Sequence, residues 1–339
     1  MQLPDYDFLP APLWLITILH LVTLTLHFLA MNFMLGGVLI VLFGRFEDRW
    51  SNPTVKKFVV LFPSIMAATV TFGVAPLLFL QVVYPKQVYA ASITSAWFWL
   101  GISGAAIWSY YFFYGSSFSK TEGPGRRPLY LLLAMLGLVY ISVVYSSVFS
   151  MAENPELIAN LYAANQSGLV LNTDVGLWIF RWAHMVLGAL TVGGFFIGLL
   201  GKDDEASFAI GRKVFLYGMI AASLFGLFWL FTLGQAMVGL MRTAGIWYLT
   251  IGILLAFGSL HFFFKKQFLG AGLMLFVSVL GMVATRHELR LVQLGDKLAN
   301  LPVRPQWDVF GLFLICFLAA IGVIAWMLKM FFEGEKAAA

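Results

Sequence analysis

The stretch PLWLITILHLVTLTLHFLAMNFMLGGVLIVL, residues 12–42, decides the fold class. It contains no Asp, Glu, Lys or Arg, and it exceeds the ~20 apolar residues with which a helix crosses the hydrocarbon core of a membrane. The rest of the chain has the same character: 61% of the 339 residues are hydrophobic, 11% are charged, and the mean hydropathy is +0.88. These values lie outside the range of soluble domains. We therefore expect an all-α, polytopic membrane protein.

Further apolar segments predict about nine transmembrane helices in total. The predicted spans are residues 12–42, 58–84, 93–114, 129–149, 175–200, 214–238, 245–264, 268–284 and 309–331. No separate soluble domain fits between them, because the longest polar stretches are residues 150–174 and 286–308. The first of these stretches has apolar residues near helical spacing, so it is either a short interfacial helix on the outer face or an ordered loop.

Basic residues predict the orientation of the spans. The loops after the first, third, fifth and seventh spans are rich in Lys and Arg, whereas the loops after the second, fourth and sixth are poorer. The pattern places the N-terminus outside and the C-terminus inside a bacterial cytoplasmic membrane. The net charge of +5 then reflects topology, and no nucleic acid is expected as a partner.

The two halves of the chain repeat one another. Equivalent residues are His27 and His184, Gly36-Gly37 and Gly193-Gly194, and Phe72-Gly73 and Phe225-Gly226. The matches predict two four-helix units in the same orientation, residues 12–149 and 175–285, followed by an outer loop at 286–308 and a ninth helix at 309–331. The paired glycines either let helices approach closely or leave room for a planar cofactor.

Acidic residues and histidines are distributed differently. All 16 acidic residues lie at span ends or in loops, which argues against a proton- or sodium-coupled transporter and against hydrolysis by paired carboxylates. Four of the five histidines lie within spans: His20, His27, His184 and His261. An imidazole in lipid needs a partner, and the strongest partner is a metal or a haem iron. Zinc is not expected, because no span gathers a Cys/His cluster.

The repeat distinguishes these histidines. His27 and His184 occupy equivalent positions, so we predict that both ligate haem iron. His20 shares a helix face with His27 two turns away and is a third candidate, although its repeat partner is Leu177. His261 matches Tyr111, and we interpret it as structural.

Basic residues near the outer ends of two spans complete the candidate site. Arg181 lies one turn from His184, where it is expected to pair with a haem propionate. Arg286 and Arg290 follow the eighth span and would serve propionates, a quinol head group or an acidic docking surface. His287 lies between them, and a ligand, a partner contact and a surface residue all remain open for it.

Several of these motifs resemble one known family. Phe180-Arg181-Trp182-Ala183-His184, followed by Arg212-Lys213, resembles the fifth and sixth helices of cytochrome bd quinol oxidase subunit I. His27-Phe28-Leu29 with Leu35-Gly36 resembles its first helix, and Phe72-Gly73-Val74-Ala75 resembles its second. The resemblance covers roughly residues 15–240. It implies that His184 ligates a low-spin haem b and that His27 ligates the haem of the oxygen site.

Departures from that family indicate which members the chain resembles most. The family's oxidases carry buried glutamates, which no span here contains, and their long loop after the sixth span is reduced to about residues 239–244. The chain is therefore more similar to the shorter relatives of that subunit, which are thought to work beside c-type cytochromes.

The sequence thus predicts a b-type haem subunit of a respiratory complex. Such a subunit moves electrons between membrane quinol or quinone and a c-type cytochrome or another redox subunit on the outer face, as part of a quinol-linked oxidoreductase. Two alternatives stay open: a bd-type quinol:oxygen terminal oxidase subunit, and a haem-free membrane anchor of a redox complex. A transporter is disfavoured by the lack of buried charge.

Overall fold

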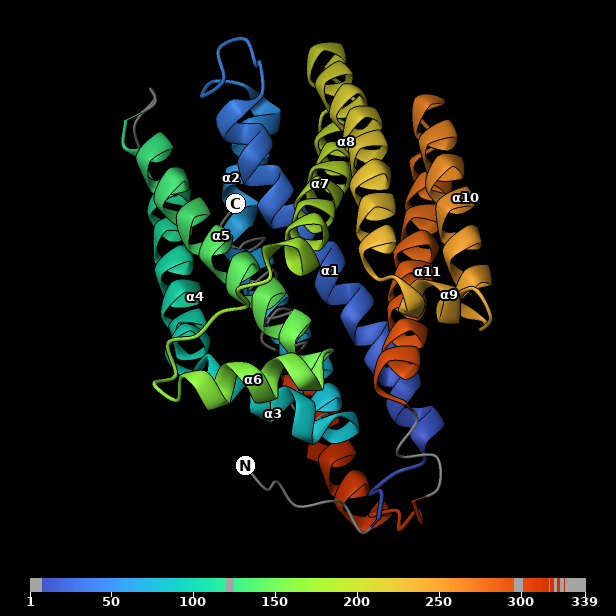
Figure 1. Ribbon diagram of the computed structural model, residues 1–339. Coiled ribbons are helices and arrows are strands. Elements are labelled where there is room, and N and C mark those ends of the chain that lie inside the picture. Colours follow the sequence, from blue (N-terminus) through green and yellow to red (C-terminus); the bar gives the residue numbers. More distant parts are fainter. Residues whose placement is uncertain are drawn as a thin grey trace. The chain divides into compact units, whose positions relative to one another are not determined.

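The computed structural model describes residues 8–119, 125–295 and 301–316, together with residues 318, 319, 322, 323 and 326. This part of the chain is all-helical apart from one isolated β-bridge. Its helices are α1 (Leu13–Phe43), α2 (Pro53–Val83), α3 (Pro85–Thr94), α4 (Ala96–Ser117), α5 (Arg127–Ala152), α6 (Pro155–Ala164), α7 (Val175–Leu200), α8 (Glu205–Thr232), α9 (Gln235–Leu240), α10 (Gly245–Phe264) and α11 (Phe268–Leu294) (Figure 1).

Among the described helices, seven are long and apolar enough to cross a membrane: α1, α2, α5, α7, α8, α10 and α11. An eighth crossing is added if α3 and α4 form one bent span. These helices fit a multi-pass membrane protein in contact with lipid. The expected ninth span, residues 309–331, lies partly outside the described residues, which include an apolar helix from Trp307 to Cys316.

The chain divides into two compact units. One consists of residues 4–16 and 297–339, where the Leu9 amide donates to the Pro302 carbonyl at 2.8 Å and the Arg304 amide donates to the Leu9 carbonyl at 2.9 Å. The other unit contains residues 17–296 and all the helices from α2 to α11, so we call it the helical body. Every candidate site residue lies in the helical body.

Neighbouring helices of the helical body are joined by hydrogen bonds from polar side chains to backbone carbonyls. Ser109 of α4 donates to the Ala134 carbonyl of α5 at 3.0 Å, and Ser278 of α11 donates to the Gly252 carbonyl of α10 at 2.8 Å. Small polar residues are well suited to this role because a membrane supplies no competing water. α4 with α5, α7 with α8 and α10 with α11 lie side by side (Figure 1).

The third span differs from its expected course. The apolar segment predicted at residues 93–114 is broken at Ser95, where α3 and α4 meet at an angle of 86°. The Ser95 hydroxyl is buried and donates to the Val170 carbonyl at 2.6 Å, which attaches the bend to the loop before α7. The straight part of this span therefore begins at Ala96, and α3 runs across the direction of α4 (Figure 1).

Two other spans end at different places from those expected. α8 stops at Thr232 instead of residue 238, because Gly234 adopts a φ of +53° and starts a new helix, α9. α11 continues to Leu294, so the outer loop expected from residue 286 starts later and Arg286, His287 and Arg290 belong to a helix. The spans expected at residues 175–200 and 245–264 coincide with α7 and α10.

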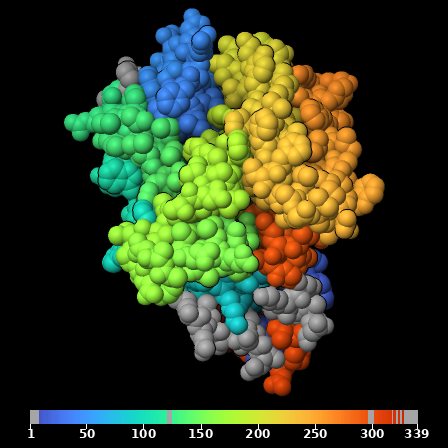
Figure 2. Space-filling view, viewed as in Figure 1, coloured from blue at the N-terminus to red at the C-terminus, as the bar shows by residue number. Residues whose placement is uncertain are grey.

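The polar stretch at residues 150–174 contains the helix α6, which was one of the two expected forms. Pro155 occupies its first turn, and the Asn154 side chain accepts a hydrogen bond from the Leu157 amide at 3.2 Å. Both features are typical of helix starts. α6 and the loop after it, coloured light green, lie at the surface in Figure 2. We call the end of the helical body that carries α3 and α6 the α6 end.

The paired glycines act as packing devices. A Cβ atom on Gly36 of α1 would lie 1.8 Å from the Ala189 carbonyl oxygen of α7, and a Cβ on Gly193 would lie 2.6 Å from the Gly36 carbonyl carbon. A Cβ on Gly37 would lie 2.5 Å from the Phe58 ring. The backbones of α1 and α7 thus touch where only glycine fits, which is how membrane helices gain van der Waals contact. These glycines do not make room for a cofactor.

Replacing Gly36 with alanine should destabilise the helical body by about 1–3 kcal/mol, because the methyl group would meet backbone atoms that cannot rotate away. Unfolding in mixed micelles of mild detergent and SDS, followed by circular dichroism, would measure this. Gly104→Ala on α4 is the matched control, because a Cβ there meets nothing within 4 Å. Equal midpoints for the two variants would contradict the close approach of α1 and α7.

Candidate functional site

His27 is held by the backbone of the next helix. Its Nδ1 lies 2.9 Å from the Thr69 carbonyl oxygen of α2. A carbonyl oxygen only accepts hydrogen bonds, so Nδ1 carries the proton and donates it. The other ring nitrogen, Nε2, is then unprotonated and keeps its lone pair for a ligand.

His184 is held in the same way in the second half of the chain. Its Nδ1 lies 2.7 Å from the Ala222 carbonyl oxygen of α8 and therefore also donates. Nε2 of His184 is again left with a free lone pair. The structure thus gives the two histidines predicted to be equivalent the same tautomer and the same kind of partner.

A glycine on the adjacent helix leaves each carbonyl oxygen accessible to its histidine. Side chains tilt toward the N-terminus of a helix, so the residue four places after a carbonyl shields that carbonyl. Here those residues are Gly73 and Gly226, and a Cβ on either would lie 2.7 Å from the imidazole of His27 or His184. The repeated Phe-Gly pairs in the sequence were the signal for this arrangement, although the sequence did not reveal their role.

The half of α7 that carries His184 is less buried than the other half. None of its residues from 177 to 188 is fully buried, whereas most residues from 189 to 198 are. Gly188 lies one turn after His184, and a Cβ there would meet nothing within 4 Å. Open space therefore lies beside His184 along the same helix.

The other histidines have different surroundings. His20 is only 3% exposed, neither of its ring nitrogens forms a well-aligned hydrogen bond, and the Pro76 carbonyl lies close to the ring. It also lies within electrostatic range of His287 and Arg290 of α11, so three candidate residues come together there. His261 is exposed on α10 and packs its ring against Phe262.

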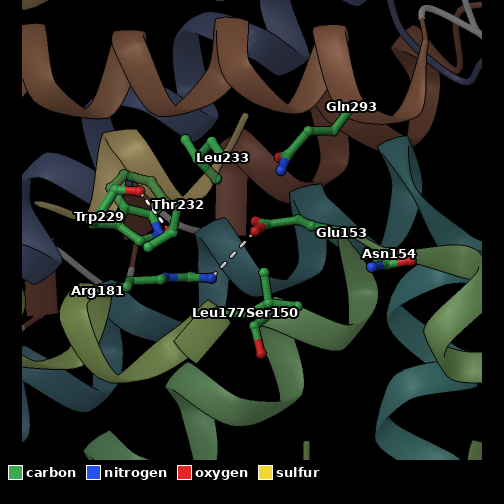
Figure 3. A pocket seen from close by; sticks show the side chains of 9 residues that line it. All are labelled: Ser150, Glu153, Asn154, Leu177, Arg181, Trp229, Thr232, Leu233 and Gln293. Atoms are coloured by element: carbon green, nitrogen blue, oxygen red, sulfur yellow. Dashed lines mark hydrogen bonds and ion pairs between the residues drawn. The ribbon is translucent and has the colours of Figure 1, made fainter. Parts of the chain in front are cut away.

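A buried ion cluster lies at the α6 end. Glu153, the residue that caps α5, is contacted by three guanidinium groups. Its Oε2 accepts from Nη1 of Arg181 at 3.2 Å and from Nη2 of Arg286, and its Oε1 accepts from Nε of Arg290 at 3.2 Å. The Glu153 side chain is 7% exposed, and the arginine side chains are nearly as buried. We call these four residues the Glu153 cluster; Figure 3 shows its Arg181–Glu153 ion pair.

A cavity of about 150 Å³ adjoins the Glu153 cluster (Figure 3). Leu177 and Arg181 line it from α7, and Trp229 lines it from α8. On α7 these residues lie seven and three positions before His184, so the cavity is roughly 5–10 Å along the helix from that histidine. Leu177 and Arg181 therefore lie on the same side of α7 as His184, within about two turns of it.

Two polar atoms near this cavity have no partner among the described residues. Nη1 of Arg286 and Oε1 of Gln293 are buried without a hydrogen bond, and the Arg286 guanidinium lies 4.7 Å from the centre of the Trp229 ring. Buried polar atoms are rarely left unpaired, because each costs about 1–3 kcal/mol. The site therefore favours a further polar ligand.

The charges of the Glu153 cluster favour an anionic ligand. Burial raises the pKa of the Glu153 carboxyl, but Arg286, Arg181 and Arg290 together lower it further, so the net pKa lies below its ordinary value of 4.5. Glu153 is therefore ionised at neutral pH. Three guanidinium groups against one carboxylate leave two positive charges in excess, and buried charge without a partner is costly.

Sequence reasoning missed Glu153, which was counted only among the acidic residues at span ends and in loops. It did identify Arg181, Arg286 and Arg290, but as three cations without a common partner. The available signal was that Glu153 lies at the end of one apolar span, while arginines lie near the ends of two other spans. Only the fold reveals that these ends meet.

Among the described residues, no group of three or more His, Cys, Asp or Glu side chains gathers that would hold a metal ion. A haem needs only one or two protein ligands, because the porphyrin supplies four nitrogens, so isolated histidines fit it. No protein-family model matches the chain, and no curated protein matches it significantly.

Proposed function

We propose that this chain is a b-type haem subunit of a membrane electron-transfer complex, with His27 and His184 as ligands of haem iron. The observation that carries the proposal is the shared geometry of these histidines. Each donates Nδ1–H to a carbonyl of the adjacent helix and keeps Nε2 free. Histidines that bind metals usually donate their other ring N–H in this way, which fixes the ring and makes Nε2 a better ligand.

The proposal includes an internal repeat of two four-helix units in the same orientation, within a fold of nine spans. Three matched features support it: the two histidine–carbonyl hydrogen bonds, the two glycines beside them, and the contact between Gly36 and Gly193. The last pair joins equivalent residues of the two halves, as expected where related units meet around a pseudo-twofold axis.

The Glu153 cluster is the proposed site for haem propionates. Arg181 and Arg286 are the residues that would hold a propionate, and the unpaired Nη1 of Arg286 is available to donate to it. The open space at Gly188 supports room for the macrocycle beside His184. When bound, the haem supplies one-electron transfer, while the protein fixes the axial ligand, limits water and adjusts the potential through nearby positive charge.

The electron partners in this proposal are membrane quinol or quinone and a c-type cytochrome or other redox subunit at the outer face of a bacterial cytoplasmic membrane. The distribution of Lys and Arg among the loops supports an outside N-terminus and an inside C-terminus. This orientation places the α6 end, with the Glu153 cluster, on the outer side. His20, His287 and Arg290 are proposed as further contacts for haem or quinol at that end.

A haem-free anchor subunit is the second candidate, because the hydrogen bonds of His27 and His184 also tie α1 to α2 and α7 to α8. A bd-type terminal oxidase has less support, because neither α1, which carries His27, nor α2, which contacts it, contains an Asp or Glu.

The reduced-minus-oxidised visible spectrum of the purified protein, with a pyridine haemochrome assay, tests the proposal. We expect haem b at one or more equivalents per chain, together with reduction by a quinol analogue. Membranes from the same host without the expressed chain are the control. Protein that is folded by circular dichroism but contains no haem b, even after incubation with haemin, would overturn the proposal in favour of the anchor.

A further inference from the structure

A second cavity lies at the end of the helical body opposite the α6 end. It has a volume of about 160 Å³ and lies between the loop after α1, the start of α2, the end of α4 and the start of α5. Its walls include Trp50, three valines of α2 and the cations Lys56 and Arg127. Among the described residues no carboxylate lines it, so the charge of this lining is positive.

Several independent features make this cavity attractive for an anion. Nε of Arg127 is buried and has no partner among the described residues, while its Nη2 donates to the Ser119 carbonyl. Neither Lys56 nor Arg127 forms an ion pair with a described carboxylate. α5 begins at Arg127, which lines the cavity, and no side chain caps that helix end, so its positive end lies beside the cavity.

The apolar wall indicates what carries the anion. Val55 and Val59 are buried in the wall, whereas Val60, one turn beyond Lys56, is 60% exposed. Further along the same side of α2, the small residues Ser64 and Ala67 are also exposed. A cation at the end of an apolar helix, followed by a shallow exposed apolar surface, matches a phosphate group with an acyl chain attached. Trp50 adds an aromatic side chain of the kind found at membrane interfaces.

We infer that this cavity binds the phosphate-bearing head group of an anionic phospholipid, with Lys56 and Arg127 contacting the phosphate and an acyl chain lying along Val60. Basic pockets between transmembrane helices bind anionic lipid head groups in this manner. A zwitterionic choline lipid carries the same phosphate, but its trimethylammonium group would be repelled by the two cations. The inference is independent of haem binding.

Native mass spectrometry of the full chain in detergent tests the inference. The protein is titrated with phosphatidylglycerol or phosphatidylcholine of identical acyl chains, with inorganic phosphate as a competitor. Each cation near a membrane surface contributes about fivefold to the binding of an anionic lipid. We therefore expect phosphatidylglycerol to bind at least fivefold more tightly, and Lys56→Gln or Arg127→Gln to reduce that binding about fivefold.

The matched control is Lys57→Gln, because Lys57 is the exposed neighbour of Lys56 and does not line the cavity. Lys56 is itself exposed, so Lys56→Gln is expected to fold even if Arg127→Gln does not. Equal binding of the two lipids, or an equal effect of Lys56→Gln and Lys57→Gln, would overturn the inference. Displacement of the lipid by millimolar inorganic phosphate would instead assign the cavity to a free anion and also overturn it.

Discussion

Replacing His184 with alanine is expected to remove one haem b from the purified protein, whereas His261→Ala leaves the full complement. His184 keeps an unprotonated Nε2, and a Cβ on Gly188, one turn later on α7, would meet nothing within 4 Å. His261 is exposed on α10 and packs against Phe262. Loss of an axial ligand from a buried haem removes the bond that holds the iron. Haem content per chain, by the pyridine haemochrome assay and protein quantification, measures the result.

His184→Asn separates ligation from structure. An asparagine amide can still donate to the Ala222 carbonyl, so the link between α7 and α8 is kept, but the variant has no nitrogen in place of Nε2. We expect the unfolding midpoint of His184→Asn to lie closer to that of the unmodified protein than the midpoint of His184→Ala does. His184→Asn should nevertheless lose the same haem. Full haem content in His184→Asn would show that another residue ligates the iron.

Replacing Glu153 with glutamine is expected to be the most destabilising polar substitution in the chain. It leaves three buried guanidinium groups without a negative partner, and breaking a buried ion pair on one side typically costs about 3–5 kcal/mol. Unfolding in mixed micelles of mild detergent and SDS would measure the loss. Glu156→Gln, in the exposed first turn of α6, is the matched control and should change stability by less than about 0.5 kcal/mol.

Glu153 should also make the free energy of unfolding depend on pH. Because the arginines hold the pKa of Glu153 below its ordinary value of 4.5, the carboxylate stabilises the fold fully above about that pH. The stabilisation is lost as the pH falls from 4.5 through the folded-state pKa. Glu153→Gln should therefore approach the unmodified protein in stability at low pH. A constant difference between the two proteins from pH 6 to pH 3 would contradict the assignment of the charge to Glu153.

The positions of the helices followed largely from the sequence. Residues 175–200 and 245–264 were expected as spans and are helices α7 and α10, since each is a continuous apolar segment with polar residues at its borders. Prediction of ends failed where apolarity continues through a break, as at Ser95 and Gly234. Prediction of ends also failed for α11, which continues through polar residues to Leu294. The helix can do so because Arg286 and Arg290 are paired with Glu153.

The sequence by itself determined that this is a helical membrane protein, and it predicted that His27 and His184 occupy equivalent positions. Apolarity and repeated spacing are patterns along the sequence, so they can be recognised without knowing the path of the chain in three dimensions. Only the tertiary structure decided which carbonyls the histidines contact, that Gly36 and Gly193 serve packing, and that Glu153 gathers three arginines. The hydrogen bonds and ion pairs among those contacts join residues 28 to 137 positions apart, and the contact between Gly36 and Gly193 joins residues still farther apart. All of them depend on distances in space that no pattern along the chain contains.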